Sequence, residues 1–247
     1  MNIYKTSQVA KVIGIHPNTV RLYEKWGLIP EAERMENHYR VFTDFHIQQL
    51  QLARTAFRVE VLQNGLRKKI IKAVKASAGK DFDGALALAC EYLEQIYVEK
   101  RNAEEATDIV KHLMQGEAMD DAPCMKRKEV SQYLDISMDT LRNWELNGLL
   151  KVKRRENGYR IYTSTDIKYL KIIRVLRCAS YSLESILHML NEVSQNPGVN
   201  INKVLNTPQR EEDIISVCDH LIISLEEAAQ NARTMINMIT DMKLKFS

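Results

Sequence analysis

The sequence lacks the features that mark membrane-spanning and secreted proteins. No uncharged apolar run approaches the roughly 20 residues that a membrane-spanning helix needs. The N-terminal segment, MNIYKTSQVAKVIG, contains no apolar core followed by a small-residue cleavage site, so we expect no signal peptide. These absences lead us to expect a cytoplasmic protein.

Closely spaced cysteines and the common catalytic motifs are also missing. The four cysteines lie far apart and form no C-x-x-C pair, which argues against a disulfide framework and against a zinc site. The sequence contains no G-x-G-x-x-G, G-x-x-x-x-G-K-[ST], G-x-S-x-G or H-E-x-x-H motif, and its six histidines have no ligand-like spacing. We therefore expect no enzyme activity, no metal ion and no cofactor.

What the sequence does contain is strongly segregated charge. The net charge of +3 hides a basic block at residues 1–75 with +7 and an acidic block at 76–122 with −7. A second basic block at 123–191 carries +6, and residues 192–247 carry −3. Basic blocks of this kind are typical of modules that bind a polyanion such as nucleic acid.

The two basic blocks hold two copies of one sequence. The stretch Thr19–Arg40, TVRLYEKWGLIPEAERMENHYR, recurs at Thr140–Arg160 as TLRNWELNGLLKVKRRENGYR. Polar residues recur in register, which hydrophobic periodicity alone does not produce, so we infer an internal duplication. The recurring residues are Thr19, Arg21, Glu24, Gly27, Leu28, Arg34, Glu36, Asn37, Tyr39 and Arg40, matched by Thr140, Arg142, Glu145, Gly148, Leu149, Arg155, Glu156, Asn157, Tyr159 and Arg160.

Each copy predicts two short helices joined by a turn, followed by a small β-wing and two more helices. In the first copy we expect helices at about 6–13, 17–26, 43–57 and 60–74, with a wing whose polar tip at 31–37 leads to a strand at 39–42. In the second we expect helices at about 125–134, 138–147, 163–178 and 182–193, with a wing at 151–162. This order is a winged helix-turn-helix.

A long helix with a heptad seam is predicted after each copy. The first runs from about Phe82 to Met114, and its seam from Ala85 to Leu113 is apolar except at Glu99. The second begins at Pro208, and its seam runs from Ile214 to Phe246. The two seams are about 43 and 50 Å long at roughly 1.5 Å per residue, so they have similar reach.

Two motif strings give the first copy a family resemblance. Val20-Arg21-Leu22-Tyr23-Glu24 with Gly27-Leu28-Ile29-Pro30, followed by His38-Tyr39-Arg40, resembles the R-Y-Y-E, G-L-(L/I)-P and G-Y-R pattern of MerR-type bacterial regulators. Leu22 and His38 depart from it. The second copy fits too, with Asn143-Trp144 in place of Tyr-Tyr, a variant that also resembles the DNA-binding domains of excisionases.

The resemblance implies which residues contact DNA. The second helix of each copy would enter the major groove, and the arginine after the wing would contact the DNA backbone. An ion pair of Arg21 with Glu24, or of Arg142 with Glu145, and core packing of Tyr23, Trp144 or the wing tyrosines are the alternatives. The implied residues are Pro17, Asn18, Thr19, Arg21, Tyr23, Tyr39 and Arg40, with Met138, Asp139, Thr140, Arg142, Asn143, Trp144, Tyr159 and Arg160.

We therefore predict an all-α protein with small β-wings, built from duplicated winged helix-turn-helix modules. The expected domains are 1–75 and 123–194, each a DNA-binding module, with 76–122 and 195–247 holding the long helices. The expected partner is double-stranded DNA, with RNA polymerase at the promoter and no membrane. Paired long helices would give a monomeric pseudo-dimer, although the last helix could instead form a homodimer.

For the function we expect a nucleoid-associated transcriptional regulator that acts by promoter distortion, which is physically a matter of DNA deformability. The alternative is an architectural or excisionase-like accessory protein without promoter control. Because residue 18 of the first copy and residue 139 of the second differ, Asn against Asp, the two copies should recognise different DNA sequences.

Overall fold

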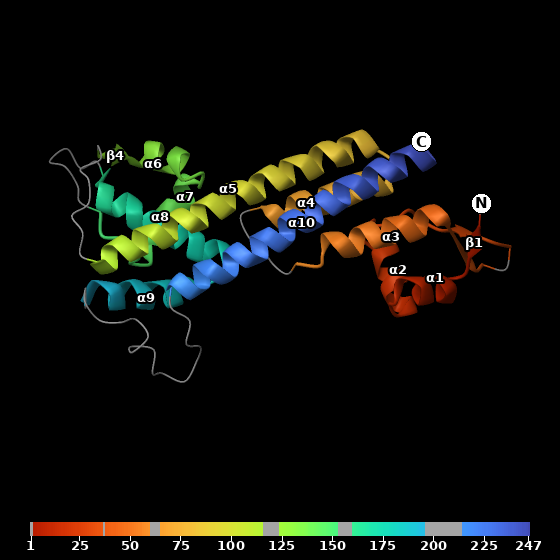
Figure 1. Ribbon diagram of the computed structural model, residues 1–247, viewed down its shortest axis with the longest axis horizontal. Helices are drawn as coiled ribbons and strands as arrows, with labels where there is room; N and C mark the ends of the chain where they lie inside the picture. Colours follow the sequence, from red (N-terminus) through yellow and green to blue (C-terminus); the bar gives the residue numbers. More distant parts are fainter. Residues whose placement is uncertain (1, 37, 60–64, 116–123, 153–159, 196–213) are drawn as a thin grey trace. The chain divides into compact units, whose positions relative to one another are not determined.

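The computed structural model describes residues 2–36, 38–59, 65–115, 124–152, 160–195 and 214–247 (Figure 1). The chain forms two compact units. Unit 1 comprises Met1–Tyr97 with Leu225–Ser247, and unit 2 comprises Val98–Ser224. Each unit therefore contains one copy of the repeated sequence together with part of each long helix.

Unit 1 contains the predicted helix-turn-helix and wing. Helices α1 (Thr6–Ile13) and α2 (Pro17–Lys25) are followed by strands β2 (Glu33–Arg34) and β3 (Arg40–Thr43), and then by α3 (Asp44–Ala56) and α4 (Leu66–Ala78). Strand β3 lies between β2 and β1 (Ile3–Tyr4), antiparallel to both. The short strand β1 before the first helix was not predicted from the sequence, because two residues are too few to show an alternating pattern.

Local sequence explains the tight turn between α1 and α2. Gly14 has φ +71°, a left-handed conformation that glycine adopts without steric cost, and it ends α1. The His16 side chain accepts a hydrogen bond from the backbone N–H of Asn18, and Pro17 takes the first helical position. The equivalent of Gly14 in unit 2 is Asp135, which has φ +49°.

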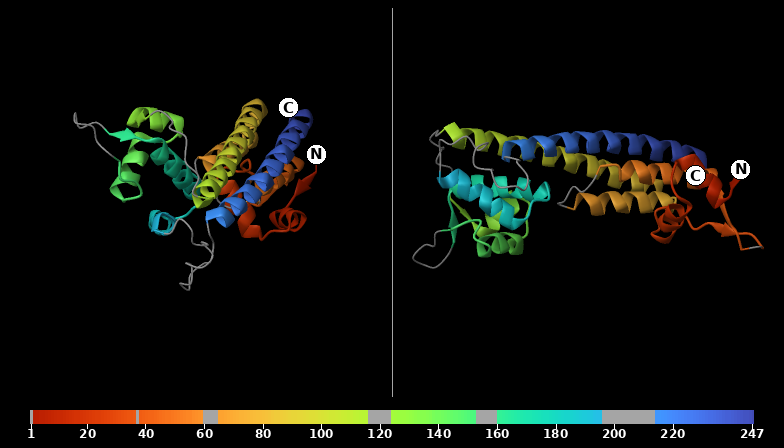
Figure 2. Two further views of the ribbon diagram at one scale, coloured as in Figure 1. Left: turned by 60° about the vertical axis from the view of Figure 1, so that its left-hand side comes forward. Right: turned by 90° about the horizontal axis from the view of Figure 1, so that it is seen from below.

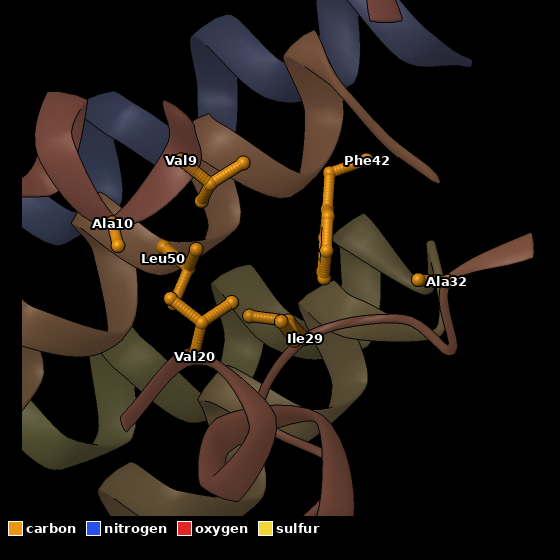
Figure 3. Packing of buried hydrophobic residues seen from close by; sticks show 7 residues of the cluster. All are labelled: Val9, Ala10, Val20, Ile29, Ala32, Phe42 and Leu50. Carbon is orange, nitrogen blue, oxygen red and sulfur yellow. The ribbon is translucent and has the colours of Figure 1, made fainter. Parts of the chain in front are cut away.

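The first module closes around a small apolar core (Figure 3). Helices α1, α2 and α3, strand β3 and the segment between α2 and β2 all contribute to it, so the core holds α2 and the wing together. Its buried members are Val9, Ala10, Val20, Ile29, Ala32, Phe42 and Leu50.

Unit 2 repeats this plan. Its elements are β4 (Met125–Lys126), α6 (Arg127–Tyr133), α7 (Met138–Leu146), β5 (Ile161–Tyr162), α8 (Ser164–Cys178) and α9 (Leu183–Gln195). Strand β4 pairs antiparallel with β5, with Met125 opposite Tyr162, as Tyr4 is opposite Phe42 in unit 1. Most of the wing predicted at 151–162 lies outside the described residues.

The helix predicted at about 60–74 overlaps α4 from Leu66 onward, and residues 60–64 lie outside the described residues. Helix α4 begins at Leu66, because Gly65 has φ +81° and cannot continue a right-handed helix. It extends to Ala78, where the buried Ser77 hydroxyl donates to Gln49 Oε1 at 2.8 Å. Gln49 in turn donates to the backbone oxygens of Leu28 at 3.0 Å and Val74 at 2.8 Å, so this buried polar group is satisfied.

The two long helices bury the seams that their periodicity predicts. Helix α5 (Phe82–Gln115) buries every seam position from Ala85 to Val110, and α10 (Ile214–Phe246) buries every seam position from Ile214 to Met242. The start expected at Pro208 lies outside the described residues. The heptad pattern is therefore confirmed for the described part of both helices.

Within unit 1, the C-terminal part of α10 runs antiparallel to the N-terminal part of α5 (Figure 2). Lys243 Nζ lies 2.5 Å from Asp83 Oδ1, and Arg233 hydrogen bonds to the hydroxyl of Tyr97. Along the direction in which residue numbers rise in α5 they fall in α10, so these two helix segments are antiparallel.

The one polar position in the α5 seam, Glu99, forms a buried ion pair in unit 2. Arg174 on α8 donates to Glu99 Oε2 from Nη1 at 2.6 Å and to Oε1 from Nη2 at 2.9 Å. Its Nε donates to the backbone oxygen of Leu134 at 2.8 Å. The side chains of Arg174 and Glu99 are only 7% and 3% exposed, so each charge depends on the other.

In the part of the chain that the structure describes, no helix is both long enough and apolar enough to cross a membrane.

Candidate nucleic-acid interface

In the first module, the N-terminal half of α2 presents two of the predicted DNA-contacting residues fully at the surface. Asn18 and Arg21 are exposed, while Pro17 and Thr19 are half-buried. Arg21 Nη1 donates to Asn18 Oδ1 at 3.2 Å, so the pair with Glu24 considered above is not formed. An amide rather than a carboxylate therefore orients the Arg21 guanidinium.

Helix α7 of the second module presents a different set. Met138, Asp139, Arg142 and Asn143 are exposed, and the Thr140 hydroxyl lies 2.8 Å from Ser137 Oγ. The Arg142 side chain makes no hydrogen bond or ion pair with any described residue. The guanidinium of the second copy thus lacks the amide partner that Arg21 has.

The two aromatic residues predicted within these helices contribute to packing. Tyr23 is half-buried against the core of the first module, and its ring centroid lies 6.4 Å from that of Trp26. Trp144 is only 4% exposed. These positions favour the packing alternative over DNA contact for both residues. Trp26, by contrast, is 52% exposed.

The arginine that follows the first wing is bound by a glutamate on α2. Arg40 Nε donates to Glu24 Oε2 at 2.7 Å, and Glu24 Oε1 accepts the backbone N–H of Ala32 at 3.1 Å. Tyr39, next to Arg40, is 68% exposed, so it does not pack beneath the wing. One carboxylate therefore connects the wing to α2.

The second module has the same connection with more partners. Glu145 Oε2 accepts from Arg160 Nε at 2.8 Å and from Arg127 Nη2 at 2.7 Å. The Tyr162 hydroxyl donates to Glu145 Oε1 and accepts from Arg127 Nε at 3.4 Å. Burial, and then the hydrogen bond to Glu145, raise the pKa of Tyr162 to about 12, so its hydroxyl is neutral at pH 7. The predicted contact Tyr159 lies outside the described residues.

The prediction of site residues missed the two glutamates and Arg127. Glu24 and Glu145 recur at the same position of the two copies, as do Arg40 and Arg160 that they bind, and this joint recurrence could have identified them. Arg127 has no such signal, because Thr6 occupies its position in the first copy. Only the folded module brings Arg127, Glu145 and Arg160 together.

The described residues contain no group of three or more His, Cys, Asp and Glu side chains that could hold a metal ion. The four cysteines, all among the described residues, form no disulfide with one another; Cys90 and Cys124 are exposed, and Cys178 and Cys218 are buried.

Comparison with known families gives the same repeat. The model of the MerR HTH family regulatory proteins matches residues 4–72 and again 125–193. These two ranges together make up more than half of the chain, and each contains one of the modules described above.

Curated proteins resemble parts of this chain. The heavy metal-dependent transcription regulator 1 of Rhizobium meliloti is 31% identical over 140 residues, which is 55% of this chain and 90% of that protein. The HTH-type transcriptional regulators ZntR and CueR of Escherichia coli are 36% and 42% identical over 64 and 59 residues. Those matches span 45% of ZntR and 42% of CueR, and 26% and 24% of this chain. No solved structure matches the chain.

Proposed function

We propose that the two modules of this chain bind the two halves of one promoter operator, because the chain belongs to the MerR helix-turn-helix family of regulatory proteins. As a member of that family the chain is a DNA-binding transcriptional regulator, and the family is one of regulators rather than enzymes. The target of a bacterial regulator is the chromosome, so the proposal includes a cytoplasmic, nucleoid-associated location.

One observation carries the proposal: each module combines an exposed recognition-helix arginine with a second arginine fixed behind the wing. Arg21 and Arg142 are the exposed ones, and Arg40 and Arg160 are fixed by Glu24 and Glu145. An arginine free to form a bidentate contact is suited to a base edge, and one held by its Nε still offers its Nη donors to a phosphate.

The proposed contacts divide accordingly. Asn18, Arg21, Asp139, Arg142 and Asn143 would contact base edges or the adjoining backbone from the start of each recognition helix. Pro17, Thr19, Met138 and Thr140 would shape that end of the helix, and Arg40, Arg160 and the wing tyrosines would contact phosphates and sugars. Tyr23 and Trp144 would support the helices from the core.

Arg21→Ala and Arg142→Ala should each weaken specific binding by about 1–3 kcal/mol if the arginine contacts a base. Because both side chains are exposed, the melting temperature should stay near that of the wild type. Binding to a duplex selected by the full chain from a random pool measures the effect. Arg54→Ala, which removes an exposed arginine from α3, is the matched control. If a variant loses stability but retains affinity, the replaced arginine has a structural role and the proposed DNA contact is wrong.

We further propose that the chain acts as a monomeric pseudo-dimer, with α5 and α10 pairing as two subunits' helices would. The antiparallel contacts in unit 1 and the similar seam lengths support this arrangement. Light scattering across the size-exclusion peak should give a mass near 28.6 kDa at low micromolar concentration. A mass near twice that value would favour a homodimer through α10 and contradict the proposal.

The mode of regulation that we propose is distortion of promoter DNA, so that RNA polymerase can engage both promoter elements. Genome-wide mapping of bound DNA tests this proposal. A few promoter sites, whose transcription in vitro changes on addition of the protein, would support it. Many dispersed sites, or the ends of mobile elements, would instead indicate an architectural or excisionase-like protein.

A further inference from the structure

In the second module Arg127, Arg160 and Tyr162 form a cluster around the Glu145 carboxylate. This cluster contains a cation, Arg127, that the first module lacks. Helix α1 begins with Thr6, and helix α6 begins at the equivalent position with Arg127. The strands differ at one matching position, since Phe42 in β3 corresponds to Tyr162 in β5. Arg127 and Tyr162 contact each other and share Glu145, so these two differences form a single local change.

The charges of the two clusters differ as a result. In the first module one arginine faces one glutamate, Arg40 and Glu24. In the second, two arginines face one glutamate, and Tyr162 adds no charge because its pKa is raised to about 12. The second cluster therefore carries one more positive charge than the first.

That surplus charge is at the surface. The Glu145 side chain is 7% exposed, whereas those of Arg127 and Arg160 are 27% and 31% exposed. Arg127 uses Nε and Nη2 within the cluster, and Arg160 uses Nε. The other guanidinium N–H groups of Arg127 and Arg160 have no hydrogen-bond partner among the described residues. Two guanidinium groups held on one buried carboxylate thus offer several fixed donors to an external anion.

Neutralising Glu145 does not require Arg127. The first module shows that one arginine and one backbone N–H satisfy the equivalent carboxylate, Glu24. In the second module Arg160 already supplies one positive charge to Glu145. Glu145 therefore does not need Arg127 as a counter-charge, and the positive charge of Arg127 is available to a ligand.

We propose that Arg127 and Arg160, positioned together by Glu145, form a binding site for a DNA backbone phosphate that exists only in the second module. The inference rests on the proposed DNA contact by the wing arginines and adds Arg127 to it. Glu145 is a positioning residue in this site, since it holds both guanidinium groups without facing the DNA. The second module would consequently hold the backbone more tightly than the first.

The test replaces Arg127 with the residue that the first module has at this position. Arg127→Thr should make the slope of log affinity against log salt less negative by about 0.9, the value for one lost phosphate contact on B-DNA. Affinity at about 0.1 M salt should fall roughly tenfold. Arg127→Lys, which retains a cation without the planar guanidinium, should recover most of the slope. The probe is a duplex selected by the full chain from a random pool.

Two controls separate this site from general electrostatics and from stability. Lys128→Thr removes the same charge from the next residue, which is exposed and lies outside the cluster. It should change the slope clearly less than Arg127→Thr does, and an equal change would overturn the proposed site. Urea unfolding of each variant is measured in parallel. If Arg127→Thr lowers stability and leaves the slope unchanged, Arg127 is structural and the proposal fails.

Arg142→Ala in the same series distinguishes this failure from that of the proposed function. Loss of affinity with Arg142→Ala but an unchanged slope with Arg127→Thr would reject only the additional phosphate site. Unchanged affinity in both variants would also contradict the proposed role of the recognition helix.

Discussion

Glu99→Gln is expected to lower the free energy of unfolding by about 3–5 kcal/mol, because it leaves the buried Arg174 guanidinium without its counter-charge. The amide has nearly the same volume as the carboxylate, so loss of packing contributes little. Both side chains are almost fully buried and share two hydrogen bonds, which makes the loss of either charge costly. Urea unfolding followed by circular dichroism measures the effect.

A matched control lies on the same helix. Glu105 on α5 forms an ion pair with Lys171 on α8 at 2.5 Å, but its side chain is 50% exposed. Glu105→Gln should therefore cost less than about 1 kcal/mol. The double variant Glu99→Leu with Arg174→Met removes both charges and should restore most of the lost stability. If Glu99→Gln and Glu105→Gln lower the free energy of unfolding equally, burial does not determine how much each ion pair contributes, and the prediction is contradicted.

The affinity for DNA should fall by a factor on the order of 10³–10⁵ as salt rises from about 50 to 200 mM, if the two modules together contact roughly 6–10 phosphates. The reason is counterion release, since each arginine or lysine that neutralises a phosphate displaces condensed cations from the duplex. Residues 1–75 and 123–191, with net charges of +7 and +6, supply ample cations for this number of contacts.

The measurement is a titration of the selected duplex at several salt concentrations, with fluorescence anisotropy as the readout. Circular dichroism of the free protein over the same range is the control, because a change in folding would also alter the affinity. A slope near zero with an intact fold would contradict binding through phosphates.

Most of the fold was predictable because its signals are local or periodic. Pro17 and Gly14 determine the start of one helix and the end of another, and the heptad steps from Ala85 onward predicted which side chains of α5 are buried. The repeated arginines predict, by the same comparison of copies, where each module should contact DNA, and this stays a prediction. Such signals need only neighbouring residues or the comparison of two copies.

What could not be predicted depends on contacts between residues distant in the sequence. Glu99 interrupts an apolar seam, and its partner Arg174 is 75 residues away on another helix. Trp144 belongs to a helix expected to contact DNA, yet its large apolar ring is buried in the core. The strands β1 and β4 exist only because β3 and β5 pair with them.

The unequal clusters around Glu24 and Glu145 give the proposed complex a polarity. A homodimer must place the same side chains on both halves of its operator, whereas this chain encodes Thr6 in one module and Arg127 in the other. A duplex with unlike halves would therefore be bound in one orientation, with α6 always toward the same end. Inverting the operator would then reverse the direction in which the protein faces along the promoter, a change that a symmetric regulator could not detect.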